Sequence, residues 1–209
     1  MPRIDDYIAA RKIAIEQLSN ETFDVILERS GFEPANGAFF RIPFLNRVYQ
    51  VGYPNFEFED LSGTGQEIPI QEQILILHYM SAASPRTLSG NRVSYREIPG
   101  ASFYFSAFVK RAIDPLKTVF GPNVTALVEA AKQLNGRPIE PGDVGFEFDV
   151  LPNVPLQLIL YEGDDEFPAE ANILFDQTIG VILSPEDIAW LAGMLVYRLI
   201  AISKRNPTS

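Results

Sequence analysis

The clearest alternation of apolar and polar residues runs through residues 144–150, which read VGFEFDV. Successive side chains of a strand point to opposite faces, so this pattern predicts a strand with one buried face. A second apolar run follows at residues 156–161 and stops before Gly163. It is short for a helix, and Pro152-Asn153 offers a turn before it. We therefore expect an antiparallel hairpin at this point of the chain.

Residues 38–53, AFFRIPFLNRVYQVGY, form a second region with strand character, because aromatic and β-branched residues alternate there with polar ones. Leu45-Asn46 separates two such runs and predicts a hairpin turn. Pro43 has no amide hydrogen to donate to a neighbouring strand, which favours an edge position for the first of the two strands.

Helical periodicity predicts four main helices, over residues 69–83, 102–119, 122–135 and 185–204. Ser184 is well placed to cap the last of them. Its apolar stripe contains Leu191, Leu195 and Leu199, which indicates a helix that is deeply buried or half of a subunit contact. Nearer the start of the chain, apolar residues between Ile4 and Leu18 fit one helical face only imperfectly.

These elements indicate an α+β fold, in which an antiparallel sheet has helices packed mainly on one face. We expect the sheet to include the strands near 39–53, 144–150 and 156–161. The 209 residues are expected to make a single domain, with an N-terminal helical lobe over residues 1–35.

The charge balance argues against two classes of partner. The formal net charge is −10, whereas binding to nucleic acid or to anionic lipid needs a basic surface. The first residues, MPRIDDYIAARK, lack the apolar segment of a signal peptide, and no run of about 18 uncharged apolar residues follows. We expect a cytoplasmic protein without a nucleic-acid or membrane partner.

The chain contains no cysteine and only one histidine, His78. Disulfides, thiolate zinc sites, cysteine nucleophiles and an iron–sulfur cluster held by this chain are therefore excluded. Sites with several histidines are excluded within one chain as well. The cofactor, if there is one, stays open.

Three stretches carry a resemblance to a known family: ILILHY at 74–79, PGASFYFSAF at 99–108, and GDDEFPAEANILFD at 163–176 followed by LSPED at 183–187. Through them the chain resembles an uncharacterised prokaryotic family, domain of unknown function 3786, over nearly its whole length. The resemblance implies iron–sulfur segments or a place in anaerobic cofactor metabolism for some members. A chain without cysteine departs from that pattern, so the resemblance implies no reaction.

Six carboxylates gather in the loop after residue 161 and its return, and these are Glu162, Asp164, Asp165, Glu166, Glu170 and Asp176. We favour the interpretation that Asp164 and Asp165 form a solvated turn through bonds to the backbone. A metal or polar-ligand site is the first alternative, although consecutive acids do not match a calcium loop. Acid–base catalysis is the second.

Glu166 and Asp176 are the strongest candidates within this loop. Each adjoins apolar residues, so we expect both at the edge of the core, where a carboxylate must find a partner or a ligand. Asp164 and Asp165 are expected to be more exposed. His78 and Tyr79 are further candidates, because the helix that carries them can share a cleft with the loop near Glu166, although a packed histidine is the commoner case.

No nucleophile with its base and no phosphate-binding loop is recognisable, so the leading functional hypothesis is a small-molecule-binding or cofactor-binding accessory protein without catalytic machinery of its own. The first alternative is a carboxylate-based enzyme that uses residues 162–176 with Mg²⁺ or Ca²⁺. The second is a homodimer or larger homo-oligomer formed through the last helix.

Overall fold

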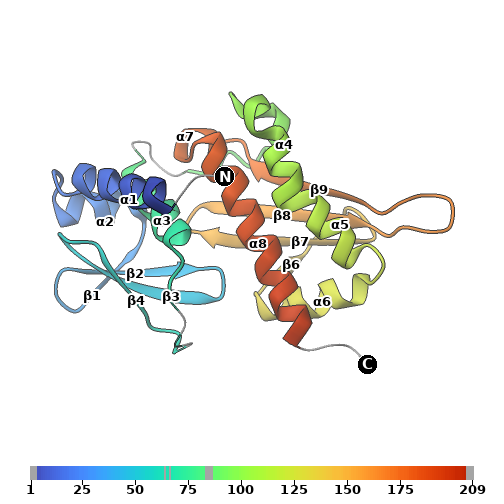
Figure 1. Ribbon diagram of the computed structural model, residues 1–209, viewed down its shortest axis with the longest axis horizontal. Helices are drawn as coiled ribbons and strands as arrows, with labels where there is room; N and C mark the ends of the chain where they lie inside the picture. Colours follow the sequence, from blue (N-terminus) through green and yellow to red (C-terminus); the bar gives the residue numbers. More distant parts are fainter. Residues whose placement is uncertain (1–3, 64, 66, 83–86, 206–209) are drawn as a thin grey trace. The chain divides into compact units, whose positions relative to one another are not determined.

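Figure 1 shows the computed structural model of the chain, in which residues 4–63, 65, 67–82 and 87–205 are described. The chain divides into two compact units. The first comprises residues 1–87 with residues 181–183, and the second comprises residues 88–180 with residues 184–209. Each unit has its own antiparallel sheet and its own helices. The single domain expected over residues 1–209 stays a prediction.

The first unit combines helices with a sheet of strand order β1-β2-β3-β4, all antiparallel. Its elements are α1 (Ile4–Leu18), α2 (Phe23–Ser30), β1 (Glu33–Ala35), β2 (Phe39–Phe44), β3 (Arg47–Gly52), β4 (Glu57–Asp60) and α3 (Ile70–Ser81). Helix α3 corresponds to the helix expected over 69–83, of which residue 83 lies outside the described residues.

The hairpin predicted within residues 38–53 is confirmed. Leu45 adopts a left-handed backbone conformation (φ 53°) in the turn, and β2 pairs with β3 on both sides of it. Pro43 faces Val48 of β3, whereas the pairing of β1 reaches only as far as Arg41. The proline therefore lies where β2 forms an edge, which accommodates its missing amide hydrogen.

The second unit contains a sheet of strand order β5-β9-β8-β7-β6, which is antiparallel throughout. Its strands are β5 (Arg92–Ser94), β6 (Arg137–Pro138), β7 (Val144–Leu151), β8 (Val154–Tyr161) and β9 (Glu170–Asp176). Its helices are the 3₁₀-helices η1 (Tyr95–Glu97) and η2 (Ala101–Tyr104), α4 (Phe105–Phe108), the π-helix η3 (Val109–Ile113), α5 (Asp114–Phe120), α6 (Val124–Gln133) and α8 (Pro185–Arg205). The short helix α7 (Ile179–Ile182) has residues in both units.

The two faces of this second sheet differ in chemistry. Helices lie across one face in Figure 1, and the apolar side chains that alternate along β7, β8 and β9 are buried, among them Phe148, Leu158 and Phe175. Directly paired residues share a face in an antiparallel sheet. The pairs Glu147 with Gln157 and Arg92 with Asp176 therefore carry polar side chains on the opposite face.

The α+β fold is confirmed, but the expectation of one sheet is wrong. The hairpin at 39–53 pairs with β1 and β4, its neighbours in sequence, whereas 144–150 and 156–161 pair within the second unit. Strand β1 also lies inside the segment 1–35 that we expected to be a helical lobe. Periodicity identifies strands, whereas the choice of partner depends on contacts between distant residues, which periodicity does not contain.

The helix expected over 102–119 runs through Asp114-Pro115 without a break. In a regular α-helix the ring of Pro115 would collide with the carbonyl group of Arg111. The π-helix η3 precedes the proline, and the amide of Asp114 donates to the carbonyl oxygen of Val109, five residues earlier. Pro115 then stands in the first turn of α5, where its missing amide hydrogen is tolerated.

Helix α8 matches its prediction. Ser184 Oγ accepts a hydrogen bond of 3.2 Å from the amide of Asp187, as a capping residue does. Leu191, Leu195 and Leu199 are fully buried within the chain. The stripe therefore belongs to the core, and the homodimer proposed through this helix stays a prediction. Among the described residues, no helix is long and apolar enough to span a membrane.

Candidate functional site

The acidic loop connects β8 to β9 and is closed by Asp164. Its Oδ1 atom accepts hydrogen bonds from the amides of Glu166 (2.8 Å) and Phe167 (2.7 Å). The amide of Asp164 donates in return to the carbonyl oxygen of Phe167, at 2.9 Å. The bonds from the Phe167 and Glu166 amides hold the pKa of Asp164 below its usual value. Asp164 is thus a turn residue, in agreement with the favoured interpretation of this loop.

Glu166 does not lie at the edge of the core, so that expectation is wrong. Asp164, Asp165 and Glu166 are all exposed, and the apolar residue after Glu166, Phe167, is itself 68% exposed. An apolar neighbour indicates burial only where the chain has a periodic structure that turns it inward. The turn of Asp164 presents Phe167 to solvent instead.

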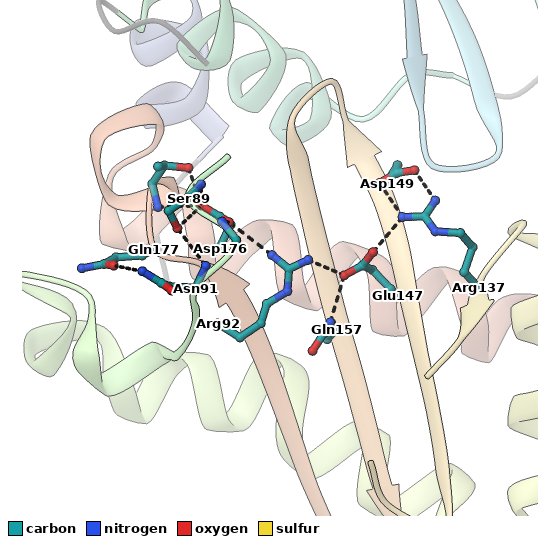
Figure 2. Close-up of polar contacts among 11 residues, drawn as sticks. Ser89, Asn91, Arg92, Arg137, Glu147, Asp149, Gln157, Asp176 and Gln177 are labelled. Carbon is teal, nitrogen blue, oxygen red and sulfur yellow. Dashed lines mark hydrogen bonds and ion pairs between the residues drawn. The ribbon is translucent and has the colours of Figure 1, made fainter. Parts of the chain in front are cut away.

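Asp176, at the end of β9, is buried as expected, with 2% of its surface exposed. Oδ1 accepts hydrogen bonds from the amide (3.0 Å) and Oγ (2.9 Å) of Ser89, and from the amide (3.0 Å) and Oγ1 (2.7 Å) of Thr178. Oδ2 accepts from the amide of Gly90 (2.8 Å) and from Nη1 of Arg92 (3.3 Å). Figure 2 shows this carboxylate at the centre of its donors.

These contacts make Asp176 an anchor for the chain around residues 89–92. Burial by itself would raise the pKa of Asp176, but the hydrogen bonds from Thr178 and Ser89 hold it well below its usual range. A carboxylate offers about four lone-pair directions, and groups of the protein already use them. The side chain is therefore committed to structure and is a poor ligand for a metal ion.

A row of alternating charges continues from Arg92 across the polar face of the second sheet (Figure 2). Arg92 Nη2 donates to Glu147 Oε2 at 2.5 Å, and Gln157 Nε2 donates to the same oxygen at 2.9 Å. Arg137 Nη2 donates to Glu147 Oε1 at 2.8 Å, and Arg137 Nη1 pairs with Asp149. Burial opposes the charge of Glu147, yet the bonds from Arg137, Gln157 and Arg92 keep its pKa below the usual value.

The ion pairs of this row connect β5 with β9 and β7, and β7 with β6. Each charge within it has a partner of opposite sign, so the row as a whole has little affinity left for an ion. Within the described ranges, no group of three or more histidine, aspartate or glutamate side chains is placed to hold a metal ion. The residues expected to form one acidic site are thus divided between a solvated turn, Asp164 to Glu166, and a structural anchor, Asp176.

His78 and Tyr79 lie on α3 in the first unit, whereas Glu166 belongs to the second, so the shared cleft stays a prediction. Tyr79 is fully buried, and its hydroxyl donates to the carbonyl oxygen of Ser30 at 2.9 Å. His78 is half-buried. Tyr79 therefore joins α3 to α2, a structural role.

A buried polar cluster between β3, β4 and α3 was not predicted from the sequence. The hydroxyl of Tyr49 donates to Glu72 Oε2 at 2.5 Å, and Arg47 lies within 3.5 Å of that hydroxyl and 3.9 Å of Asp60. Burial, and then the bond to Glu72, raise the pKa of Tyr49 far above its usual value. The signal was the alternation of Arg47 and Tyr49 along β3, which places both side chains on its buried face.

A groove of about 560 Å³ opens beside α1 in the first unit, and its residues were also missed. Its apolar walls are Ile8 and Ile15 from α1, Ile68 from the segment that leads into α3, and Ile70 from the first turn of α3. The rest of the lining consists of Arg11, Lys12, Glu16, Glu67 and Gln73. Sites for small molecules typically measure about 300–1,000 Å³ and have mostly apolar walls.

The available signal was the imperfect apolar face of α1. Ala14 and Leu18 are buried, whereas Ile4 and Ile8 are 61% and 54% exposed. Ile4, Ile8 and Ile15 follow helical spacing and lie beside the buried stripe, not within it. An apolar strip that stays uncovered among the described residues is a candidate binding surface.

Comparison with known proteins gives one match. A family model matches residues 22–198, and that family is described as a domain of unknown function (DUF3786). The resemblance drawn from residues 74–79, 99–108 and 163–187 is therefore confirmed. No curated protein and no solved structure matches the chain.

Proposed function

Because the chain belongs to the DUF3786 family, whose description names no reaction, we propose from the geometry alone that it is a binding protein for a small amphipathic carboxylate. The groove beside α1 is the binding site in this proposal. The observation that carries it is an open apolar groove of about 560 Å³ with a guanidinium group in its wall.

Arg11 supplies the polar end of the site. Its Nε donates to Gln73 Oε1 at 2.7 Å, and its Nη2 donates to the carbonyl oxygen of Phe56 at 3.0 Å. Both acceptors are neutral, and within the described part of the chain Arg11 forms no ion pair. The guanidinium group is thus fixed in position while its positive charge stays available to a ligand.

The other charges of the groove leave Arg11 as the recognition group. Lys12 and Glu16 lie 3.8 Å apart on the exposed side of α1, where they pair with each other. Glu67 is exposed, so its charge is screened by water. A ligand with an apolar body can lie against the isoleucines while its carboxylate meets Arg11. A cytoplasmic location, where such metabolites occur, belongs to the same proposal.

Octanoate is a suitable probe, because it joins a short apolar body to one carboxylate. We expect saturable binding to the full chain by isothermal titration calorimetry, and weaker binding of octan-1-ol, which lacks the charge. Ile8→Glu brings a carboxylate into the apolar wall, so it should weaken octanoate binding at least about tenfold. The absence of any octanoate binding at millimolar concentration would overturn the proposal.

Ile13→Glu provides the matched control. Ile13 lies on the same helix and is 55% exposed, against 54% for Ile8, but it does not line the groove. This variant should bind octanoate as the unchanged protein does. An equal loss in both variants would show that the added negative charge acts at long range and that the groove is not the site.

A further inference from the structure

Arg111 of the second unit has a donor that the protein leaves unused. Its Nη1 atom is buried and has no hydrogen-bond partner within residues 4–63, 65, 67–82 and 87–205. Over the same residues, Arg111 forms no ion pair with an acidic side chain. A guanidinium group carries five N–H donors and a permanent positive charge. A buried member of such a group is therefore expected to have an acceptor.

The guanidinium group of Arg111 lies over the face of an aromatic ring. Its central carbon lies 4.2 Å from the centre of the Trp190 ring, which belongs to α8. The face of an indole attracts a cation, but it offers no oxygen or nitrogen acceptor to the N–H groups of the guanidinium. The ring therefore holds the charge of Arg111 in place, while the Nη1 donor stays without an acceptor among the described residues.

The backbone around Arg111 is arranged to bring it close to α8. A side chain at Gly193 would place its Cβ 3.2 Å from the carbonyl oxygen and 3.3 Å from the Cβ of Arg111, so only glycine allows this approach without displacement. Arg111 also lies within η3, and π-helical turns occur often at functional sites. The five-residue turn shifts Arg111 relative to the α-helical residues on either side of it.

The neighbouring polar groups do not supply the acceptor. Tyr95 is close enough to Arg111 and Glu186 for their charges to influence it, and burial is the main reason that its pKa rises to about 12. Its hydroxyl donates to the carbonyl oxygen of Pro185, at 2.7 Å. The hydroxyl of Tyr95 is thus neutral, and it does not accept a hydrogen bond from Nη1 of Arg111.

We propose that Arg111 binds an oxyanion, either a carboxylate or a phosphate group, through Nη1, with the Trp190 ring as the floor of the site. An oxyanion matches the donor in charge and in the planar geometry of its bonds. The site lies in the second unit and is independent of the function proposed for the groove beside α1.

Trp190 is the single tryptophan of the chain, so intrinsic fluorescence reports on this site directly. The full chain is titrated with inorganic phosphate and separately with acetate, at constant ionic strength set with chloride. We expect a saturable change in Trp190 emission with one of the two probes, and the responding probe identifies the oxyanion. If the partner of Nη1 is a single buried water molecule, neither probe should give a saturable change in emission. That result would overturn the proposal.

Arg111→Gln removes the charge and should weaken binding by at least about tenfold, since a hydrogen bond to a charged group is lost. Arg111→Lys keeps the positive charge but loses the planar guanidinium group, so it should also bind the oxyanion more weakly than the unchanged protein does. Because the charge over Trp190 is kept, this variant should fold even if Arg111→Gln does not. Arg96→Gln is the control, because Arg96 stacks on Phe105 at 3.8 Å but is exposed. An unchanged response in both Arg111 variants would equally contradict the proposal.

Discussion

Two carboxylates with similar sequence surroundings have opposite environments in this protein. Glu166 precedes an aromatic residue and Asp176 follows one, yet Glu166 is exposed and Asp176 is 2% exposed. The difference arises from the local structure. Asp176 ends a strand whose alternate side chains enter the core, whereas Glu166 belongs to a turn closed by Asp164. Residue type and neighbours alone do not determine whether a charge has structural consequences.

Replacing Asp176 by Asn tests this contrast. Asparagine keeps one acceptor oxygen but loses the charge that serves Ser89, Thr178 and Arg92. We expect the free energy of unfolding to fall by at least about 2 kcal/mol, measured by urea denaturation. Asp165→Asn and Glu166→Gln alter exposed side chains and should change it by no more than about 0.5 kcal/mol.

The same anchor predicts a pH dependence. The pKa of Asp176 is lower in the folded chain than its unfolded value of about 3.9, so the unfolded chain takes up the proton first as the pH falls. The stabilisation by Asp176 is complete above about pH 5 and decreases below it. Stability should thus fall less steeply on acidification in Asp176→Asn than in the unchanged protein. Parallel curves of stability against pH for the two proteins would contradict this role of Asp176.

The metal-site alternative has its own test. A gain in melting temperature with millimolar Mg²⁺ that is lost in Glu166→Gln would support it.

At the scale of elements, α8 is the segment whose sequence and structure agree best. The capping residue Ser184 and the leucine stripe are local signals, and local signals are sufficient to define a long amphipathic helix. The structure adds that the stripe is covered by the protein itself. Packing in the core, and not contact with a second subunit, is therefore the role to be tested first.

Leu195→Ala should lower the free energy of unfolding by about 2–5 kcal/mol, because it removes a fully buried side chain and leaves a cavity. Tyr197→Ala, two residues further along the helix, alters a side chain that is 56% exposed and should cost much less. Chemical denaturation of the two variants gives the comparison. A shift of a few tenths of a kcal/mol for Leu195→Ala would show that the stripe is not part of the core.

The sequence predicts elements of this protein better than it predicts their partners. The strand at 144–150 follows from local periodicity, the strand at 156–161 from a short apolar run, and the buried position of Asp176 from its apolar neighbours. Strand β9, which carries Asp176, was not predicted. The division into two sheets does not follow from the sequence pattern, because the apolar and polar positions of residues 39–53 suit a hairpin in either sheet. The groove beside α1 and the unused donor of Arg111 were missed for the same reason, since both depend on which faces the fold leaves without a partner.

At the scale of the whole molecule, neither compact unit is a continuous segment of the chain. Residues 181–183 group with the first unit, although the residues on both sides of them belong to the second. Residues 181–183 of the first unit are therefore joined covalently, on both sides, to residues of the second unit. This arrangement favours a cooperative molecule over two independent ones.

Chemical denaturation followed by two probes tests that expectation. Trp190 reports only on the second unit, whereas far-ultraviolet circular dichroism reports on the helices of both. We expect the two transitions to share one midpoint, as a single domain requires. Separate midpoints would show that the two units unfold independently and would contradict the single domain expected over residues 1–209.

The strands at the borders of the two sheets have a consequence for behaviour at high concentration. β1, β4, β5 and β6 contain three, four, three and two residues. Pro34 and Pro138 remove amide donors from two of these borders, and Glu57, Glu59 and Asp60 place negative charge on a third. Short, charged or proline-containing borders are poor templates for the addition of further strands. We therefore expect the pairing of one sheet edge with another, the step that leads to amyloid, to be unfavourable at these borders.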